Sequence, residues 1–274
     1  MHGEDAAQED GQEGHRDPEG EGLTGSWRAC VAYDGTRYAG FQVQENAPTV
    51  QGELERALAR ICDEPVRITG AGRTDAGVHA IGQVINFRTA SALAGSDLGS
   101  GVNALLPADI AISALEPCGE AFHARFSATG RTYEYRLRND EARRPLERRE
   151  HWYPQALDLA AMRDAADRLP GRRDFSAFAM GEGGIRTVRR AVWSAEGSLL
   201  RFEIEADAFL RGMVRAIVGT MIWIGRGKID LAAFDVIVAG ADRAKAGPNA
   251  PPGGLCLTHV SYRDDNEKAT REHR

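Results

Sequence analysis

An aspartate, an arginine and a histidine lie close together in the segment GRTDAGVHA, residues 72–80. Arg73 and Asp75 are two positions apart, so in an extended backbone both side chains leave from the same face. Glycines within the segment permit backbone conformations that a side chain forbids. Such a carboxylate beside a guanidinium can serve catalysis or form a structural ion pair at a tight turn, and the segment alone leaves both interpretations open.

The elements around this segment are predicted from the spacing of apolar residues. Four strands are expected in the N-terminal half, at residues 27–33, 66–70, 82–88 and 109–116. A helix is expected at 49–62, where apolar residues recur at helical spacing and Thr49 can cap the first turn. The segment 72–80 therefore lies in a loop between two strands.

The C-terminal half repeats this mixture of strands and helices. Strands are expected at residues 131–138, 187–195, 199–206 and 255–262, and helices at 157–169, 209–225 and 231–239. In the first of these strands Tyr133, Tyr135 and Leu137 share one face, and Asp158 can cap the first helix. This order fits two α+β halves, each an antiparallel sheet with helices on one face, better than a regular parallel α/β repeat.

The two ends of the chain differ from the rest in composition. Residues 1–24 hold eight acidic residues and one arginine, a net charge of −7, so the remaining chain carries +1 of the total of −6. Residues 1–24 and 264–274 contain too few apolar side chains to offset the entropy of ordering, and both are predicted to be disordered tails. Between them arginine greatly outnumbers lysine, which suits phosphate recognition but can equally reflect genome composition.

Several classes of protein and site are disfavoured. The chain has no run of about 18 apolar residues and no apolar secretory leader, so no membrane association and a cytoplasmic location are expected. The four cysteines are far apart and lack metal-ligand spacing, which predicts buried thiols and no metal site. GAGRTDAG (70–77) lacks the third glycine of a dinucleotide fingerprint, and GRGK (225–228) lacks the spacing of a phosphate-binding loop, so no cofactor is expected.

Five segments together resemble a known family. They are YDGTRYAGFQVQ (33–44), GRTDAGVHA (72–80), FHARFSATGRTYEYRL (122–137), DFSAF with RTV (174–178 and 186–188), and FLRGMVRAIVG (209–219). Their order and rough spacing resemble those of the tRNA pseudouridine synthase A family, over about residues 26–263. The second segment is the specific one, and the others would be weak alone.

The resemblance implies two pseudo-equivalent α+β domains, residues 25–121 and 122–263, whose sheets meet around a central cleft. It also implies an isomerase without a cofactor, which converts uridines 38, 39 and 40 in the anticodon stem and loop of tRNA to pseudouridine, and a homodimer. Asp75 matches the family's catalytic aspartate, and Arg73 the arginine that helps to hold the flipped-out nucleotide. Tyr133 matches the tyrosine that contacts substrate, and Arg215 is expected beside Asp75 if the fold brings it close.

The assignments have structural alternatives. Tyr133 could belong to the core like Tyr135, Arg215 could only neutralise a buried helix face, and the histidines, His79 included, are expected to be structural. Two other functions also fit: an RNA-binding module without catalysis, and a pseudouridine synthase with another RNA target.

Three positions depart from the family's pattern. Phe41, Asp207 and Gly212 stand where tryptophan, asparagine and histidine are common. Gly212 is expected to cost its helix about 1 kcal/mol against alanine. The departures bear on affinity and target choice more than on the chemistry.

Overall fold

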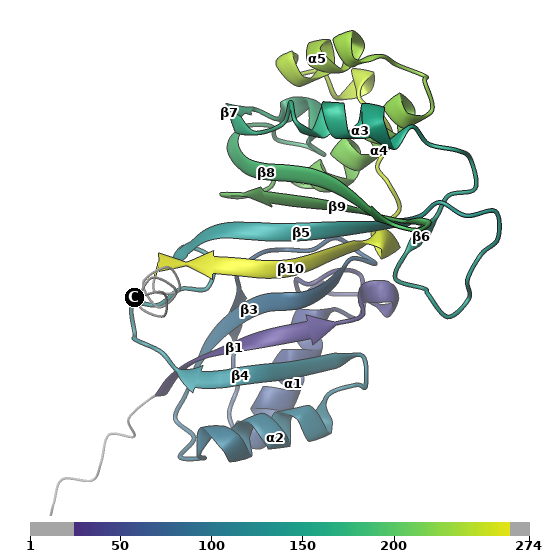
Figure 1. The fold of residues 1–274 in the computed structure, drawn as a ribbon. Helices are drawn as coiled ribbons and strands as arrows, with labels where there is room; N and C mark the ends of the chain where they lie inside the picture. Colours follow the sequence, from purple (N-terminus) through teal and green to yellow (C-terminus); the bar gives the residue numbers. More distant parts are fainter. Residues whose placement is uncertain (1–24, 264–274) are drawn as a thin grey trace, which may run out of the picture.

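A computed structural model describes residues 25–263, in which ten strands form one sheet. The strand order is β4-β1-β3-β10-β5-β9-β8-β7, with β2 paired to β3 and β6 paired to β5 (Figure 1). The two segments expected to be disordered, 1–24 and 264–274, lie outside the described residues. The α+β class is confirmed, and the strands of both halves belong to a single sheet.

The elements of the N-terminal half follow the predicted order with one addition. They are β1 (Gly25–Tyr33), the short helix η1 (Gly35–Arg37), α1 (Val50–Cys62), β2 (Ile68–Gly70), β3 (His79–Thr89), α2 (Gly95–Leu105) and β4 (Ile110–Pro117). Thr49 caps α1 as predicted, because its hydroxyl accepts a hydrogen bond from the Gly52 amide at 3.2 Å.

Helix α2 is the addition, and its sequence explains why it was not expected. GSDLGSGVNAL contains three glycines, and the residue before it, Ala94, gives no side-chain cap. Tertiary contacts hold it instead. The Asn103 amide donates to the Ile112 carbonyl at 2.9 Å and accepts from the Ile112 amide at 2.8 Å, which clamps α2 to β4.

The C-terminal half contains most of the helices. Its elements are β5 (Ala128–Arg138), β6 (His151–Trp152), α3 (Leu159–Ala166), β7 (Gly171–Asp174), η2 (Ser176–Phe178), β8 (Ile185–Glu196), β9 (Leu199–Ala206), α4 (Met213–Gly225), α5 (Leu231–Ala239), η3 (Arg243–Lys245), η4 (Pro252–Gly254) and β10 (Leu255–Tyr262). The predicted cap is present, because Asp158 accepts from the Ala161 amide at 3.0 Å.

Helix α4 begins later than predicted. Gly212 has φ of 71° and precedes the helix, which starts at Met213 rather than at residue 209. The predicted cost of Gly212 inside a helix is therefore wrong, because glycine is favoured in this left-handed conformation. The thirteen residues of α4 are buried on nearly all sides, and no helix in the described part of the chain has the length and apolarity to cross a membrane.

The two halves of the sheet join at its centre through β10. This strand pairs antiparallel with β5 and parallel with β3, where Cys256 lies opposite His79 and Leu257 opposite Ala80. Within each half the long strands pair antiparallel, as expected. The last strand of the sequence therefore connects β3, which follows the segment 72–78, to β5, which carries Tyr133.

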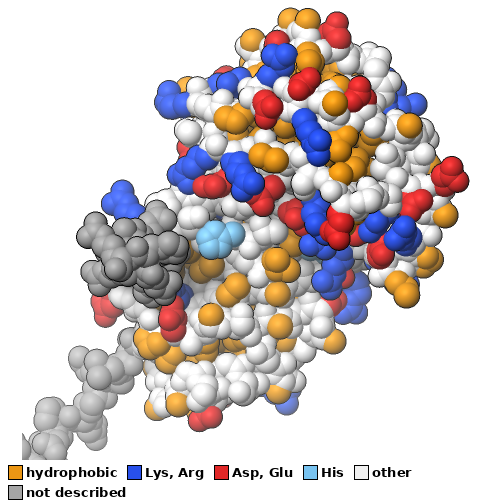
Figure 2. Space-filling model, in the orientation of Figure 1, with side chains coloured by type: hydrophobic (Ala, Val, Ile, Leu, Met, Phe, Trp, Pro, Cys, Tyr) orange, Lys and Arg blue, Asp and Glu red, His pale blue; other side chains and the backbone are white. Residues whose placement is uncertain are grey.

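The sheet has one buried face and one open face. Along β5 and β9 buried residues alternate with half-buried ones, and the buried set includes Tyr135, Leu137, Phe202 and Ile204. Figure 2 shows that the open face carries closely mixed acidic and basic side chains over the strands of the C-terminal half. Ion pairs such as Arg190 to Glu203, at 2.7 Å, neutralise much of this charge.

Candidate active site

Residues 72–78 form a loop that ends in a tight turn before β3, and His79 and Ala80 are the first two residues of that strand. The Val78 amide donates to the Asp75 carbonyl at 3.1 Å, and Gly77 has φ of 77°, which favours glycine. The fully buried Gln83 side chain holds the start of the loop. Its amide donates to the Gly72 carbonyl at 2.7 Å and accepts from the Gly72 amide at 3.2 Å, as a neighbouring strand would.

A second loop, residues 34–41, packs against the first. The Phe41 amide donates to the Thr74 carbonyl at 3.1 Å, and the Gly77 amide donates to the Tyr38 carbonyl at 3.3 Å. Gly40 has φ of 107°, and a Cβ there would lie 2.8 Å from the Thr74 carbonyl oxygen. The close approach of the two backbones fixes the residues on either side of Asp75.

Asp75 meets Arg215 across the junction of the two halves. One Arg215 Nη lies 3.4 Å from an Asp75 carboxylate oxygen, and the two side chains are 16% and 29% exposed respectively. The segment before β10 fixes the arginine, because Arg215 Nε donates to the Ala250 carbonyl at 2.7 Å. A carboxylate open to solvent on one side and paired on the other can approach a substrate while its partner holds it in position.

Arg73 does not form the local ion pair that its spacing suggested. Its side chain is exposed, and it has no hydrogen-bond or ion-pair partner among the described residues. The pair fails to form because the Asp75 carboxylate faces Arg215, which is 140 positions away and invisible to local spacing. The Arg73 guanidinium is thus open to solvent beside Asp75.

Tyr133 is too buried for the whole face of its ring to stack on a base. It is 7% exposed, and its ring meets Phe209 edge to face with centroids 5.1 Å apart. Its hydroxyl has no hydrogen-bond partner in the described part of the chain. Burial raises the pKa of this hydroxyl, and the nearby Asp75 charge adds to the shift, so the group stays a neutral donor.

Arg131 is a buried residue of the site that the sequence reasoning missed. It is 9% exposed and has no carboxylate partner among the described residues; instead it donates to the carbonyls of Ala71 and Arg125, both at 2.8 Å, and of Asp207 at 2.9 Å. It thereby ties the start of the catalytic loop to β5 and to the end of β9. Its inward position could have been predicted, because Arg131 is two residues before Tyr133 and therefore lies on the same face of the strand.

His79 has a structural role, as expected. Its Nδ1 accepts from the Gly35 amide at 3.0 Å, and its Nε2 lies 3.1 Å from the Gly253 carbonyl. Burial lowers the pKa of this imidazole, which favours a neutral ring with one acceptor and one donor nitrogen. The ring therefore joins the loop 34–41 to η4, the turn immediately before β10.

The structure shows the contacts of Phe41 and Asp207, two of the three departures from the family's pattern. Phe41 is buried, and its ring lies against Gly70, where a Cβ would come within 2.4 Å of it. One Asp207 carboxylate oxygen accepts from the Thr187 amide at 2.9 Å and from the Ala208 amide at 2.7 Å. An asparagine oxygen could accept the same two bonds, so the difference at this position is one of charge.

The cysteines differ from expectation in burial. Cys30, Cys62, Cys118 and Cys256 are free and half-buried rather than fully buried. Burial raises the pKa of Cys256 to about 11, which keeps this thiol protonated and unreactive at neutral pH. In residues 25–263 no group of three or more histidine, cysteine, aspartate or glutamate side chains could hold a metal ion.

Comparison with known proteins places this chain among enzymes of one kind. The family model described as tRNA pseudouridine synthase matches residues 29–127 and 165–263. A tRNA pseudouridine synthase A from Geobacter sulfurreducens is 44% identical over 240 residues, which cover 86% of this chain and 98% of that protein. The protein of the same name from Geobacillus kaustophilus is 41% identical over 250 residues, covering 89% of this chain and 96% of that one.

One solved structure is similar at a much lower level. It is described as an H/ACA RNP bound to a substrate RNA containing 2'-deoxyuridine, and it covers 72% of this chain and 53% of its own. The identity is 8% and the TM-score is 0.33, so the likeness carries no conclusion about this chain. The family match and the sequence relatives suffice, and this chain belongs to the tRNA pseudouridine synthase family.

Proposed function

We propose that this pseudouridine synthase acts on uridines 38, 39 and 40 in the anticodon stem and loop of tRNA, with Asp75 as its catalytic carboxylate. In the reaction the bond from uracil N1 to ribose C1′ breaks, the uracil turns, and C5 bonds to C1′. C5 then loses its proton and N1 gains one. The reaction is an isomerisation, so atoms and electrons balance without a co-reactant.

The observation that carries this proposal is the half-exposed Asp75 carboxylate beside Arg215, on a loop held from three sides. Gln83, the loop 34–41 and Arg131 fix the backbone around it. A carboxylate held this firmly can act as nucleophile or base at a flipped nucleotide without first being reorganised. Arg215, 3.4 Å away, holds the carboxylate from the other half of the molecule.

The remaining residues are proposed to hold the flipped uridine. Extracting a stacked base costs a few kcal/mol, so new contacts must replace those lost. Arg73 is exposed and unpaired beside Asp75, where it can occupy the space or neutralise the phosphate left behind. Tyr133 is proposed to contact the uracil through its hydroxyl, which has no hydrogen-bond partner within residues 25–263, because only 7% of the residue is exposed for stacking.

The assembly and the domain division extend this proposal. The family model matches in two blocks, 29–127 and 165–263, which supports two domains at 25–121 and 122–263. We expect a cytoplasmic homodimer in which one anticodon arm contacts both subunits. Sedimentation of the purified protein should give about twice the chain mass of 29.7 kDa.

Release of tritium from uracil C5 tests the proposal directly, because C5 must lose its hydrogen. With tRNA transcript labelled at C5, we expect wild-type protein to release tritium. Asp75→Asn should release none above background, while its unfolding midpoint and tRNA affinity stay near wild type. Transcripts in which uridine 38, 39 or 40 is replaced one at a time identify the uridines that the enzyme modifies. Release by Asp75→Asn equal to that of wild type would contradict the catalytic assignment.

A further inference from the structure

A loop on the C-terminal half holds a cavity that the catalytic site does not use. It connects β5 to β6, residues 139–150, and encloses about 340 Å³. Four arginines, two glutamates, a proline and a tryptophan line it: Arg138, Arg143, Arg144, Pro145, Glu147, Arg148, Glu150 and Trp152. The cations outnumber the anions in this lining, so the charge pattern favours an anionic occupant.

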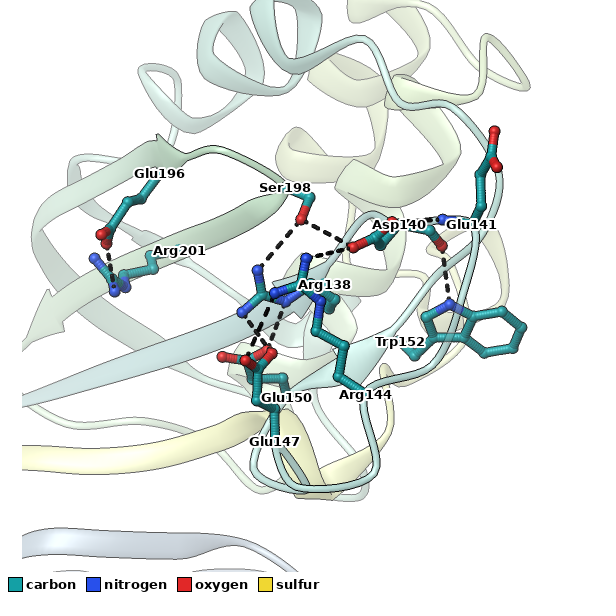
Figure 3. A network of polar contacts seen from close by, with 10 residues as sticks. All are labelled: Arg138, Asp140, Glu141, Arg144, Glu147, Glu150, Trp152, Glu196, Ser198 and Arg201. Carbon is teal, nitrogen blue, oxygen red and sulfur yellow. Dashed lines mark hydrogen bonds and ion pairs between the residues drawn. The ribbon is translucent and has the colours of Figure 1, made fainter.

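The carboxylates around the cavity are already committed to two of the arginines. Arg138 pairs with Glu150 at 2.7 Å and with Glu147 at 2.8 Å, and Figure 3 shows both glutamates converging on it. Arg144 pairs with Asp140 at 2.8 Å. These ion pairs give the loop its shape. Both glutamates of the cavity lining are used by Arg138, and the remaining carboxylate of the loop, Glu141, lies outside the lining.

Arg143 and Arg148 are therefore the unneutralised charges of the cavity. Arg143 lies over the Trp152 ring, with its guanidinium carbon 4.8 Å from the ring centroid. Arg148 makes one hydrogen bond, to the Pro145 carbonyl at 3.2 Å. Both side chains are exposed, and neither forms an ion pair within residues 25–263. A guanidinium held over a ring or against a carbonyl keeps most of its donors free for phosphate oxygens.

The loop is also joined to the catalytic edge of the sheet. Arg149 lies 3.4 Å from Asp34, the residue that caps η1 in the loop 34–41. The other Asp34 oxygen lies 3.2 Å from His79, at the end of the catalytic motif. The loop 139–150 is thus tied to the loop 34–41, which packs against the loop that carries Asp75.

We propose that the cavity of the loop 139–150 binds the phosphate backbone of the substrate tRNA through Arg143 and Arg148. This inference rests on the proposed function, because it needs an RNA bound at Asp75. The site is for phosphate and carries no base recognition of its own, since its donors are guanidinium groups and its one aromatic ring is covered by Arg143. It adds affinity outside the catalytic centre and makes that affinity depend on salt.

The test compares matched double variants in tRNA binding over a range of salt. Arg143→Gln with Arg148→Gln should weaken binding about tenfold near 0.1 M salt and reduce the slope of log affinity against log salt by nearly 2, at about 0.9 per lost contact. Arg143→Lys with Arg148→Lys keeps the charge and should keep most of the slope. The control, Arg60→Gln with Arg172→Gln, removes two exposed arginines that also lack ion pairs within residues 25–263, and should bind as wild type does.

Two results would overturn the inference. One is a wild-type slope in the Arg143→Gln, Arg148→Gln protein while wild type still releases tritium from tRNA. The other is an unchanged slope together with altered sedimentation, which would mean that the loop contacts a second copy of the chain. The 98% exposed Leu146 of this loop could contribute to such a contact. Absence of tritium release by wild type is a separate failure, that of the proposed function.

Discussion

The partners of individual residues decide what the candidate site can do. Asp75 obtains its cation from a helix in the other half of the molecule, while the arginine two positions away has no ion pair within residues 25–263. This arrangement separates two tasks that a local ion pair would have combined. In the proposed function, Arg215 holds the carboxylate in place and Arg73 meets the nucleic acid.

Gly212 offers a test at a single backbone position. Its φ of 71° opposes a side chain, and so does the Met180 sulfur, which would lie 2.7 Å from an added Cβ. We expect Gly212→Ala to lower the free energy of unfolding by about 1–2 kcal/mol, the cost of a left-handed conformation. Chemical denaturation measures this change in the free energy of unfolding. Gly119→Ala is the control, because no atom lies within 4 Å of its added Cβ, and equal losses in both variants would contradict this explanation.

At the scale of elements, strand β3 positions the loop that carries Asp75 through one side chain. Both polar atoms of the Gln83 amide are bonded to the backbone of Gly72, three residues before Asp75. The helix α2 is held by a similar clamp, from Asn103 to Ile112, far from the site in the sequence and in the fold. The two clamps allow an effect on stability to be separated from an effect on catalysis.

Replacing Gln83 with methionine keeps its length and removes both hydrogen bonds. We expect a loss of about 1–3 kcal/mol in stability, because buried backbone groups are left unsatisfied. The kcat for tritium release should also fall at least tenfold with little change in KM, since a carboxylate displaced by about 1 Å can lose 100-fold in rate. Asn103→Leu should show the loss of stability alone. A Gln83→Met protein with normal kcat would show that the clamp serves folding only.

The elements were largely predictable from sequence, whereas the contacts that build the site were not. Alternation in RTYEYRL and the capping residues Thr49 and Asp158 are local signals, so strand β5 and helices α1 and α3 could be placed in advance. Helix α2 was missed because Asn103 stabilises it from outside. Asp75 was found by its motif, but its contact with Arg215 depends on the packing of two halves, which no local pattern contains.

At the scale of the whole molecule, one sheet runs through both halves. Strand β10 bonds to β3 on one side and to β5 on the other, and Arg131 and Arg215 add contacts across the same junction. Neither half can complete its sheet without this strand. We therefore expect the N-terminal and C-terminal halves to unfold together in a single transition.

Tryptophans on either side of β10 allow this unity to be measured. Trp27 lies on β1 and Trp193 on β8, so two variants that each retain one of them, with the other three tryptophans changed to phenylalanine, report the halves separately. We expect their fluorescence transitions in urea to share one midpoint and one slope, as cooperative unfolding requires. Midpoints that differ beyond error would show that the halves unfold independently.

The central place of β10 also bears on how the protein is made. The ribosome synthesises the chain from the N-terminus to the C-terminus. The loop that carries Asp75 is therefore made long before β10, which pairs with the strand that follows it. His79 then lacks its Gly253 partner, Arg215 lacks Ala250, and the edge of β3 stays unpaired. A chain that ends before residue 250 therefore lacks three of the contacts that surround Asp75 in the finished protein.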